Sequence, residues 1–145
     1  RFREAQKENG MEFPEDLYYS KDHAWVRLTA GKAVIGVTDH AQKEMGAIVF
    51  ADLPEEGADI EKGETLGSLE SSKTVAEVSA PISGQVLKSN TDLEEDPSLI
   101  NDDPYGNGWL VTMDIDDPDE LEGLLNSVEY ENYLEKKDEK KESKG

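Results

Sequence analysis

The sequence predicts a mainly β fold, a sandwich or small barrel with a few helical appendages. Short runs rich in β-branched and aromatic residues recur between turn residues through the middle of the chain, and helical patterns are few. Two such runs, 65–71 and 74–80, meet at Lys73. This lysine lies near the midpoint between turn residues at Gly63 and Gly84. We therefore expect Lys73 at the tip of a β-hairpin.

Several elements are expected in the chain before this hairpin. Residues 39–46 predict a two-turn helix, with Asp39 as the N-cap, Gln42 completing a capping box and Gly46 at the C-terminus. Residues 47–53 predict a buried strand that Pro54 ends. Three earlier strands, joined by tight turns, are expected at 17–20, 24–29 and 32–37.

The elements expected after the hairpin are more irregular. A strand at 85–88 precedes a helical turn at 96–100, in which Asp96 is the expected N-cap. Residues 109–115 alternate as an amphipathic strand, and the capping box 117–120 opens a helix. A final helix is expected around 128–134.

The 145 residues are enough for one domain with extensions. We expect an N-terminal extension at 1–16, one folded domain at 17–134 and a charged, disordered tail at 135–145. Residues 1–10 fit a small helix or a disordered leader equally well.

Charge and composition restrict the partners. The net charge of −19 disfavours nucleic acid and anionic membrane surfaces. The chain contains no cysteine, which excludes disulfides and thiolate chemistry, and no apolar run reaches the length of a membrane span. The simplest location is the cytoplasm.

The sequence contains little that could perform catalysis. Its two histidines, His23 and His40, do not form a known catalytic or metal-binding motif, and the acidic clusters lack the spacing of a calcium loop. No metal site and no enzyme activity are expected. An exposed lysine is usually an ordinary surface residue, but Lys73 lies between small polar residues at a hairpin apex, where it could accept a covalent group. The chemistry would then belong to that group.

One segment around the lysine resembles the lipoyl-attachment motif of the glycine cleavage system H protein family. The segment consists of Glu70, Ser71, Ser72, Lys73 and Thr74, with Gly63 before it and 81–84 after it. Further blocks that resemble this family occur at 19–26, 36–42, 46–54 and 100–110, so that the resemblance extends from about 17 to 134.

The resemblance implies a barrel-sandwich hybrid of the lipoyl-domain type, with C-terminal helices packed on the sandwich. It implies lipoic acid in amide linkage on Lys73, a recognition hairpin formed by Glu70, Ser71, Ser72 and Thr74, and a cleft in which His40 contacts the arm. The family usually has an acidic residue at the position of Ala24. A contact between a carboxylate at that position and the amine of the loaded arm is therefore missing from this chain.

The implied function is that of a shuttle. Proteins of this family carry an aminomethyl group from glycine decarboxylase (P protein) to aminomethyltransferase (T protein). Dihydrolipoamide dehydrogenase (L protein) then reoxidises the dithiol of the lipoyl arm. A lipoate ligase or lipoyltransferase attaches the lipoyl group. We expect a monomer in the cytoplasm, or in the mitochondrial matrix of a eukaryote.

Three alternatives stay open at this point. An H-like lipoyl carrier could serve another pathway, such as sulfur oxidation or lipoyl relay, and Ala24 leaves room for it. A biotinyl carrier would be expected to have methionines beside the lysine, where this chain has Ser72 and Thr74. An interaction module would leave Lys73 unmodified.

Overall fold

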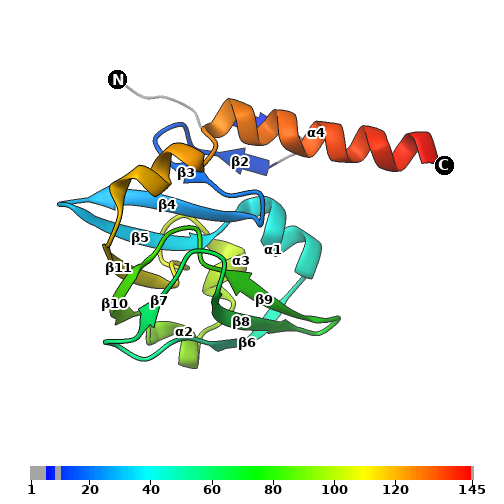
Figure 1. Cartoon of the computed structure of the whole chain (residues 1–145). Helices are drawn as coiled ribbons and strands as arrows, with labels where there is room; N and C mark the ends of the chain where they lie inside the picture. The colour runs from blue at the N-terminus through cyan, green and yellow to red at the C-terminus, as the bar shows by residue number, and fades with distance from the viewer. Residues whose placement is uncertain (1–5, 9–10, 145) are drawn as a thin grey trace, which may run out of the picture.

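Two antiparallel sheets form most of the fold. The computed structural model describes residues 6–8 and 11–144, with side chains described for 11–136. The larger sheet has six strands in the order β3-β4-β5-β11-β10-β7, and the smaller has three in the order β6-β8-β9. A two-stranded ribbon, β1-β2, precedes them. Figure 1 shows α4 lying across the top of the larger sheet, while the β8–β9 hairpin projects sideways from the body.

The strands and helices have the following bounds. The strands are β1 (Gln6–Glu8), β2 (Met11–Phe13), β3 (Tyr18–Tyr19), β4 (Ala24–Thr29), β5 (Lys32–Val37), β6 (Ile48–Asp52), β7 (Asp59–Ile60), β8 (Thr65–Ser71), β9 (Val75–Ser79), β10 (Gly84–Ser89) and β11 (Val111–Ile115). The helices are α1 (Asp39–Met45), α2 (Asp92–Glu95), α3 (Leu99–Asp102), the 3-10 helix η1 (Pro118–Gly123) and α4 (Ser127–Lys144).

The prediction of a mainly β sandwich with a few short helices is confirmed. The two sheets remain separate and do not close into a barrel. Burial of apolar side chains between them provides the main driving force for folding. The core between the sheets includes Val26 and Ile35 from the larger sheet and Leu66, Leu69 and Val78 from the smaller one.

A second apolar cluster lies on the opposite face of the larger sheet. On β4 the side chain of Trp25 belongs to this cluster while its neighbour Val26 belongs to the main core, as the alternation of a strand requires. Tyr130 and Leu134 of α4 cover the cluster, and Phe13 of β2 fills its edge. The expectation that a C-terminal helix packs on the sandwich is confirmed. The N-terminal extension contributes a buried side chain, Phe13, to this cluster.

Three buried tyrosines predict that the protein loses stability in alkaline solution. Burial raises the pKa of Tyr19, Tyr105 and Tyr130 far above the usual value of 10. Above about pH 10 the unfolded chain therefore releases phenolic protons that the folded chain retains, and the free energy of unfolding falls as pH rises. Each tyrosine contributes a slope of about 1.4 kcal/mol per pH unit, or about 4 kcal/mol for all three.

Urea unfolding at a series of pH values between about 8 and 11.5 measures this slope. Tyr19→Phe is the control, because it should remove about one third of the slope. A free energy of unfolding that stays constant over this range would contradict the prediction.

The N-cap of α1 differs from the prediction. Thr38, and not Asp39, is the cap: its Oγ1 accepts a hydrogen bond from the Ala41 backbone N at 3.2 Å. The Asp39 carboxylate is used elsewhere, because it accepts from Gln42 Nε2 at 2.6 Å and from the Glu12 backbone N at 2.9 Å. Asp39 thus ties α1 to β2.

The strand β6 is not buried as a whole. Ile48 and Ala51 point into the core, whereas Val49 and Phe50 are exposed. The expectation of a buried strand is wrong for its outward-facing residues, because the smaller sheet packs on the core with only one of its faces. A register irregularity between Ile48 and Phe50 places Val49 at a β-bulge.

The capping arrangement downstream also differs from the predictions. Helix α2 ends immediately before the expected turn at 96–100, with Asp96 as its C-cap. Helix α3 begins within that turn and is preceded by Ser98, so Asp96 is not the N-cap. Asp117 caps η1, but Glu120 does not complete a capping box. Instead, its carboxylate accepts from Ser83 N at 2.7 Å and from Ser83 Oγ at 2.9 Å.

The chain ends also differ from the expectations. β1 pairs with β2, so residues 6–8 form a strand and not a helix or leader. The expectations for residues 1–5, 9, 10 and 145 lie outside the described residues. Helix α4 continues to Lys144, which corrects the expectation of a disordered tail from residue 135. This helix contains no glycine or proline and is rich in Glu and Lys, which favour helix formation.

Candidate functional site

Lys73 lies at the tip of the β8–β9 hairpin, as its position between two strand-forming runs predicts. The strands pair from Thr65 opposite Ser79 to Glu70 opposite Val75. One further hydrogen bond, from Ser71 N to Thr74 O at 2.8 Å, closes the turn. The lysine side chain is exposed, and within the described part of the chain its Nζ forms no hydrogen bond or ion pair.

Ser71 holds the turn in place from inside. Its side chain is only 6% exposed, and its Oγ accepts hydrogen bonds from the backbone N atoms of Lys73 and Thr74, both at 3.1 Å. Such a serine turn fixes the backbone that carries the lysine. The other hairpin residues of interest, Glu70, Ser72 and Thr74, are exposed around the lysine.

Replacing Ser71 by alanine is therefore expected to loosen the tip. Two backbone N–H groups lose their acceptor, each worth about 1 kcal/mol. We expect faster amide hydrogen exchange at Lys73 and Thr74, by roughly fivefold to thirtyfold, while the sheets stay folded. Ser68→Ala on the same strand is the matched control. Equal exchange rates in the wild type and Ser71→Ala would contradict this role.

The body of the protein supports the hairpin tip from below. Ser72 N donates to Ala47 O at 3.3 Å, which ties the turn to the segment between α1 and β6. Asn101 of α3 fixes that segment: its Nδ2 donates to Gly46 O at 2.9 Å, and its Oδ1 accepts from Ile48 N at 2.8 Å. A Cβ placed on Gly46 would lie 3.1 Å from Lys73 Cε, so the lysine stem lies against this glycine. Sequence reasoning assigned no role to Asn101.

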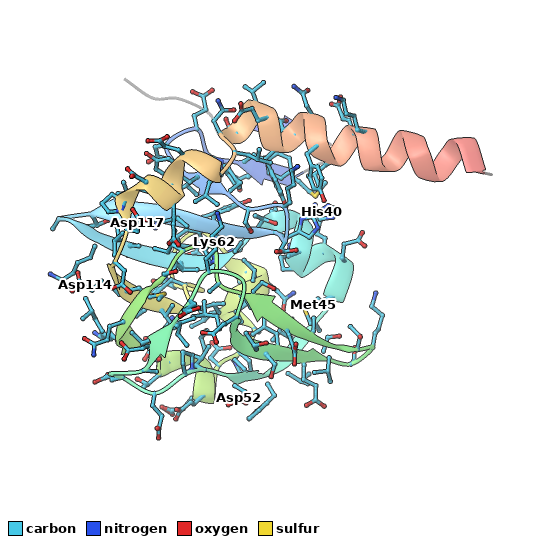
Figure 2. The ribbon with its side chains drawn as sticks, viewed as in Figure 1. His40, Met45, Asp52, Lys62, Asp114 and Asp117 are labelled. Atoms are coloured by element: carbon cyan, nitrogen blue, oxygen red, sulfur yellow. The ribbon has the colours of Figure 1, made fainter. Side chains whose placement is uncertain are left out.

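A cavity of about 330 Å³ lies beside the hairpin, between α1, β9 and α4. This is within the size range of small-molecule sites. Residues from five separate parts of the chain line it: Asp22, His23, Val37, His40, Ala41, Glu44, Met45, Leu69, Ala76, Glu77, Val78 and Leu134. Figure 2 shows His40 at the end of α1 that lies below α4, and Met45 on the side of the hairpin.

The cavity combines an apolar interior with acidic side chains. Asp22 and Glu44 are exposed acidic residues at its border. Glu77 also lines the cavity, but its Oε1 accepts a hydrogen bond from Thr65 Oγ1 at 3.3 Å on the exposed face of the sheet. The rings of His23 and His40 lie side by side, with their centroids 4.7 Å apart. An apolar pocket bordered by carboxylates suits a ligand with an apolar stem and a cationic end.

The sequence predicts a cleft contact for His40 and a missing acidic contact at Ala24. The two residues are placed differently with respect to this cavity. His40 does line it, together with Glu44 one turn later in α1. Ala24 does not line it: its side chain is fully buried on β4. Asp22, two residues earlier, provides a carboxylate at the border instead. Pattern analysis did not select Asp22, Glu44 or Glu77, because solvated acids are common in this chain.

No group of three or more His, Asp or Glu side chains among the described residues is arranged to hold a metal ion. None of the helices there has the length and apolar character required to cross a bilayer.

A sandwich of two sheets that presents an exposed lysine at a hairpin tip is the arrangement of the lipoyl-domain type of fold, which lipoyl and biotinyl carriers share. The sequence profile of the family described as "Glycine cleavage H-protein" matches residues 17–137. The chain therefore belongs to the glycine cleavage H-protein family.

Individual relatives agree with this assignment. Glycine cleavage system H protein 4 of Aquifex aeolicus is 48% identical over 119 residues, which are 82% of this chain and 70% of that protein. The glycine cleavage system H protein of Brevibacillus brevis is 47% identical over 83% of this chain and 96% of its own length. The crystal structure of the H protein from Mycobacterium marinum is similar with a TM-score of 0.73 and 36% identity, covering 81% of this chain and 95% of that chain.

Proposed function

We propose that this protein is the lipoyl-bearing shuttle of a glycine cleavage system, with lipoic acid in amide linkage on Lys73. The observation that carries the proposal is an exposed lysine, without a partner for its Nζ among the described residues, on a pinned turn beside an acidic cavity. Its Nζ has room to accept an acyl group. Membership of the H-protein family supports lipoate over biotin.

The protein's own contribution is presentation and shielding. When bound, the lipoyl group would supply a dithiolane that can take up an aminomethyl group, and it would be left as a dithiol once the one-carbon unit is passed on. Ser71 and Asn101 fix the backbone at the base of the arm, so the arm would move between enzymes relative to a rigid attachment point. The shuttle itself performs no catalytic step in this proposal, since the three partner enzymes provide the catalytic groups.

The cavity is the proposed resting place of the loaded arm. The arm is an apolar chain that ends in an amine, and its ammonium form would be stabilised by the carboxylates of Asp22 and Glu44. These acids would replace the contact that Ala24 lacks. Excluding water there would slow the loss of ammonia before transfer.

His40→Ala is expected to speed the spontaneous loss of ammonia from the loaded form. Losing one hydrogen bond of about 1 kcal/mol corresponds to a rate increase of roughly fivefold. Lys43→Ala, an exposed position on the same helix, is the matched control. The measurement is ammonia release over time without the aminomethyltransferase, and an unchanged rate would remove His40 from the site.

The proposed partners are the glycine decarboxylase, the aminomethyltransferase and the dihydrolipoamide dehydrogenase, together with a lipoate ligase or lipoyltransferase. A surface with net charge −19 supports brief docking on electropositive patches of several enzymes in turn. We propose a monomer in the cytoplasm, and the bacterial relatives support this location.

Reconstitution tests the proposed function. The lipoylated protein is added to purified glycine decarboxylase, and exchange of labelled bicarbonate into the carboxyl group of glycine is measured. Exchange that depends on the lipoylated form is the expected result. A lipoylated protein that supports no exchange would favour an H-like carrier of another pathway, and a biotin adduct in the intact mass would contradict the lipoyl assignment.

A further inference from the structure

A row of polar side chains runs from the start of α1 to α3. Gln42 lies at its centre and is only 8% exposed. Its Nε2 donates to Asp39 Oδ1 at 2.6 Å, and its Oε1 accepts from Asn101 Nδ2 at 2.8 Å. We call Asp39, Gln42 and Asn101 the polar relay. Asp39 and Gln42 share one face of α1, whereas the opposite face lines the cavity with His40 and Glu44.

Each end of the polar relay is tied to the backbone of another segment. At one end, Asp39 Oδ2 accepts from the Glu12 backbone N of β2 at 2.9 Å. At the other end, Asn101 Nδ2 also donates to Gly46 O at 2.9 Å, and its Oδ1 accepts from Ile48 N at 2.8 Å. The relay therefore joins the N-terminal ribbon to the segment between α1 and β6.

This segment supports the base of the lysine arm. The stem of Lys73 lies against Gly46, and Ala47 O accepts from Ser72 N at 3.3 Å. Asn101 thus fixes the backbone below the hairpin tip, while its hydrogen bond with the side chain of α1 fixes Asn101 itself. The cavity wall and the attachment point are held by one continuous set of hydrogen bonds.

The groups at the two ends determine which atoms donate inside the relay. An ionised carboxylate only accepts, so Gln42 must turn its NH2 towards Asp39 and its oxygen towards Asn101. The backbone N–H of Ile48 only donates, so Asn101 must turn its oxygen towards Ile48 and its NH2 towards Gln42. Both amides have a single satisfied orientation, and none of the described buried side-chain N or O atoms lacks a partner. Such a fully satisfied network makes the local structure rigid.

We propose that Gln42 is a positioning residue that keeps the cavity in register with Lys73. The inference rests on the proposed function, because the register matters only when a loaded arm folds into the cavity. Gln42 itself does not line the cavity. It acts through α1, which carries His40 and Glu44, and through Asn101, which supports the lysine. A small misplacement of such supporting groups is enough to weaken a site built from several elements.

The test exchanges the two polar groups at positions 39 and 42. In Gln42→Glu, two carboxylates face each other and repel, so the hydrogen bond between them is lost. In Asp39→Asn, a single oxygen has to serve two donors, the Glu12 N–H and the Gln42 NH2. The double variant, Asp39→Asn with Gln42→Glu, restores the row: the amide at position 39 accepts from Glu12 and donates to the carboxylate at position 42, which accepts from Asn101. Loss in both single variants and rescue in the double variant is the expected pattern.

Amide hydrogen exchange in the unlipoylated protein gives the first readout. The Ile48 N–H bonds to Asn101 and reports the hairpin end of the relay. We expect it to exchange at least about tenfold faster in each single variant, and within about threefold of the wild type in the double variant. Amides of the β10–β11 pair should change less, which separates a local effect from a loss of global stability. If Gln42→Glu does not fold, as judged by circular dichroism, Asp39→Asn carries the comparison.

Ammonia release from the loaded form gives the second readout. The lipoylated variants are loaded with glycine and glycine decarboxylase, and release is followed without the aminomethyltransferase. We expect release to be at least roughly fivefold faster in the single variants, and within about twofold of the wild type in the double variant. Ser89→Ala on β10 is the matched control, because it removes a different side-chain hydrogen bond, from Ser89 Oγ to Pro54 O at 2.6 Å. Its release rate should stay within about twofold of the wild type.

Several outcomes would overturn the inference. Unchanged Ile48 exchange in the folded single variants would show that the relay does not support the hairpin side. Faster exchange with wild-type ammonia release would show that Gln42 supports the fold without positioning the arm, and would leave the proposed function intact. A double variant that fails to recover would contradict the pairing of the two groups. A lipoylated wild-type protein that cannot be loaded with an aminomethyl group would overturn the proposed function itself, and the inference with it.

Discussion

Lys73→Arg is expected to abolish lipoylation completely while leaving the fold intact. An arginine guanidinium stays protonated in proteins and offers no nucleophilic amine to an activated acyl group. The lysine side chain is exposed and its stem contacts Gly46 only from outside, so the longer side chain can be accommodated. Intact mass after incubation with ligase, lipoate and ATP should show no lipoyl adduct, and glycine–bicarbonate exchange should fall to background.

Lys62→Arg is the matched control for this substitution. Lys62 is also exposed and precedes Gly63, in the turn that begins the hairpin's first strand. Its backbone N donates to Ser83 Oγ at 2.9 Å, which ties this turn to the one before Gly84. We expect a full lipoyl adduct in Lys62→Arg. An adduct that persists in Lys73→Arg, or that disappears in Lys62→Arg, would place the attachment site elsewhere.

The hairpin can be predicted from the sequence because its signals are local. The runs 65–71 and 74–80 predict strands, and the structure has Thr65–Ser71 and Val75–Ser79. Alternating side chains and adjacent turn residues specify such an element within about fifteen residues. The position of Lys73 at the tip follows directly from the two strand ends.

The cavity cannot be predicted in this way because it is assembled from distant segments. Asp22 follows β3, Glu44 belongs to α1, Glu77 to β9 and Leu134 to α4. Each acid is, in its own segment, one more charged residue on a strand, helix or turn of a highly acidic chain. Only the packing of the sheets and helices brings them to one border, and no short-range pattern encodes that arrangement.

The errors in the local predictions have the same origin. Asp39 has the usual chemistry of an N-cap, but its carboxylate is used by Gln42 within the same helix and by the distant Glu12 backbone N, and Thr38 takes the cap. The apolar run of β6 resembles a buried strand, yet the sheet has a free face on which Phe50 is exposed. In both cases long-range structure decided what the local pattern left open.

Tyr130 joins the C-terminal helix to the cavity. Its ring stacks on Tyr19 with centroids 4.8 Å apart and meets Phe13 edge-on at 5.5 Å. Its Oη lies 2.8 Å from His23 Nδ1 and 2.9 Å from Thr38 Oγ1. Thr38 caps the helix that carries His40 and Glu44, so this hydroxyl links α4 to the wall of the cavity.

Two substitutions of Tyr130 should therefore have different effects. Tyr130→Phe keeps the stacking but removes the hydroxyl that contacts His23 and Thr38, so the free energy of unfolding should fall by about 1–3 kcal/mol. Tyr130→Ala also creates a cavity in the second apolar cluster and should cost about 3–5 kcal/mol. Urea unfolding measures both values. Val128→Ala, an exposed position on the same helix, is the control and should change stability by less than about 0.5 kcal/mol.

The loaded form provides a second readout for the same variants. Tyr130 positions the capped end of α1, and Leu134, one turn later in α4, lines the cavity. Loss of the Tyr130 contacts should therefore open the cavity proposed to shelter the arm. We expect ammonia release from the loaded Tyr130→Phe protein to be faster than from the wild type at a temperature where both are folded. A variant that loses stability as expected but releases ammonia at the wild-type rate would show that α4 stabilises the sandwich without guarding the arm.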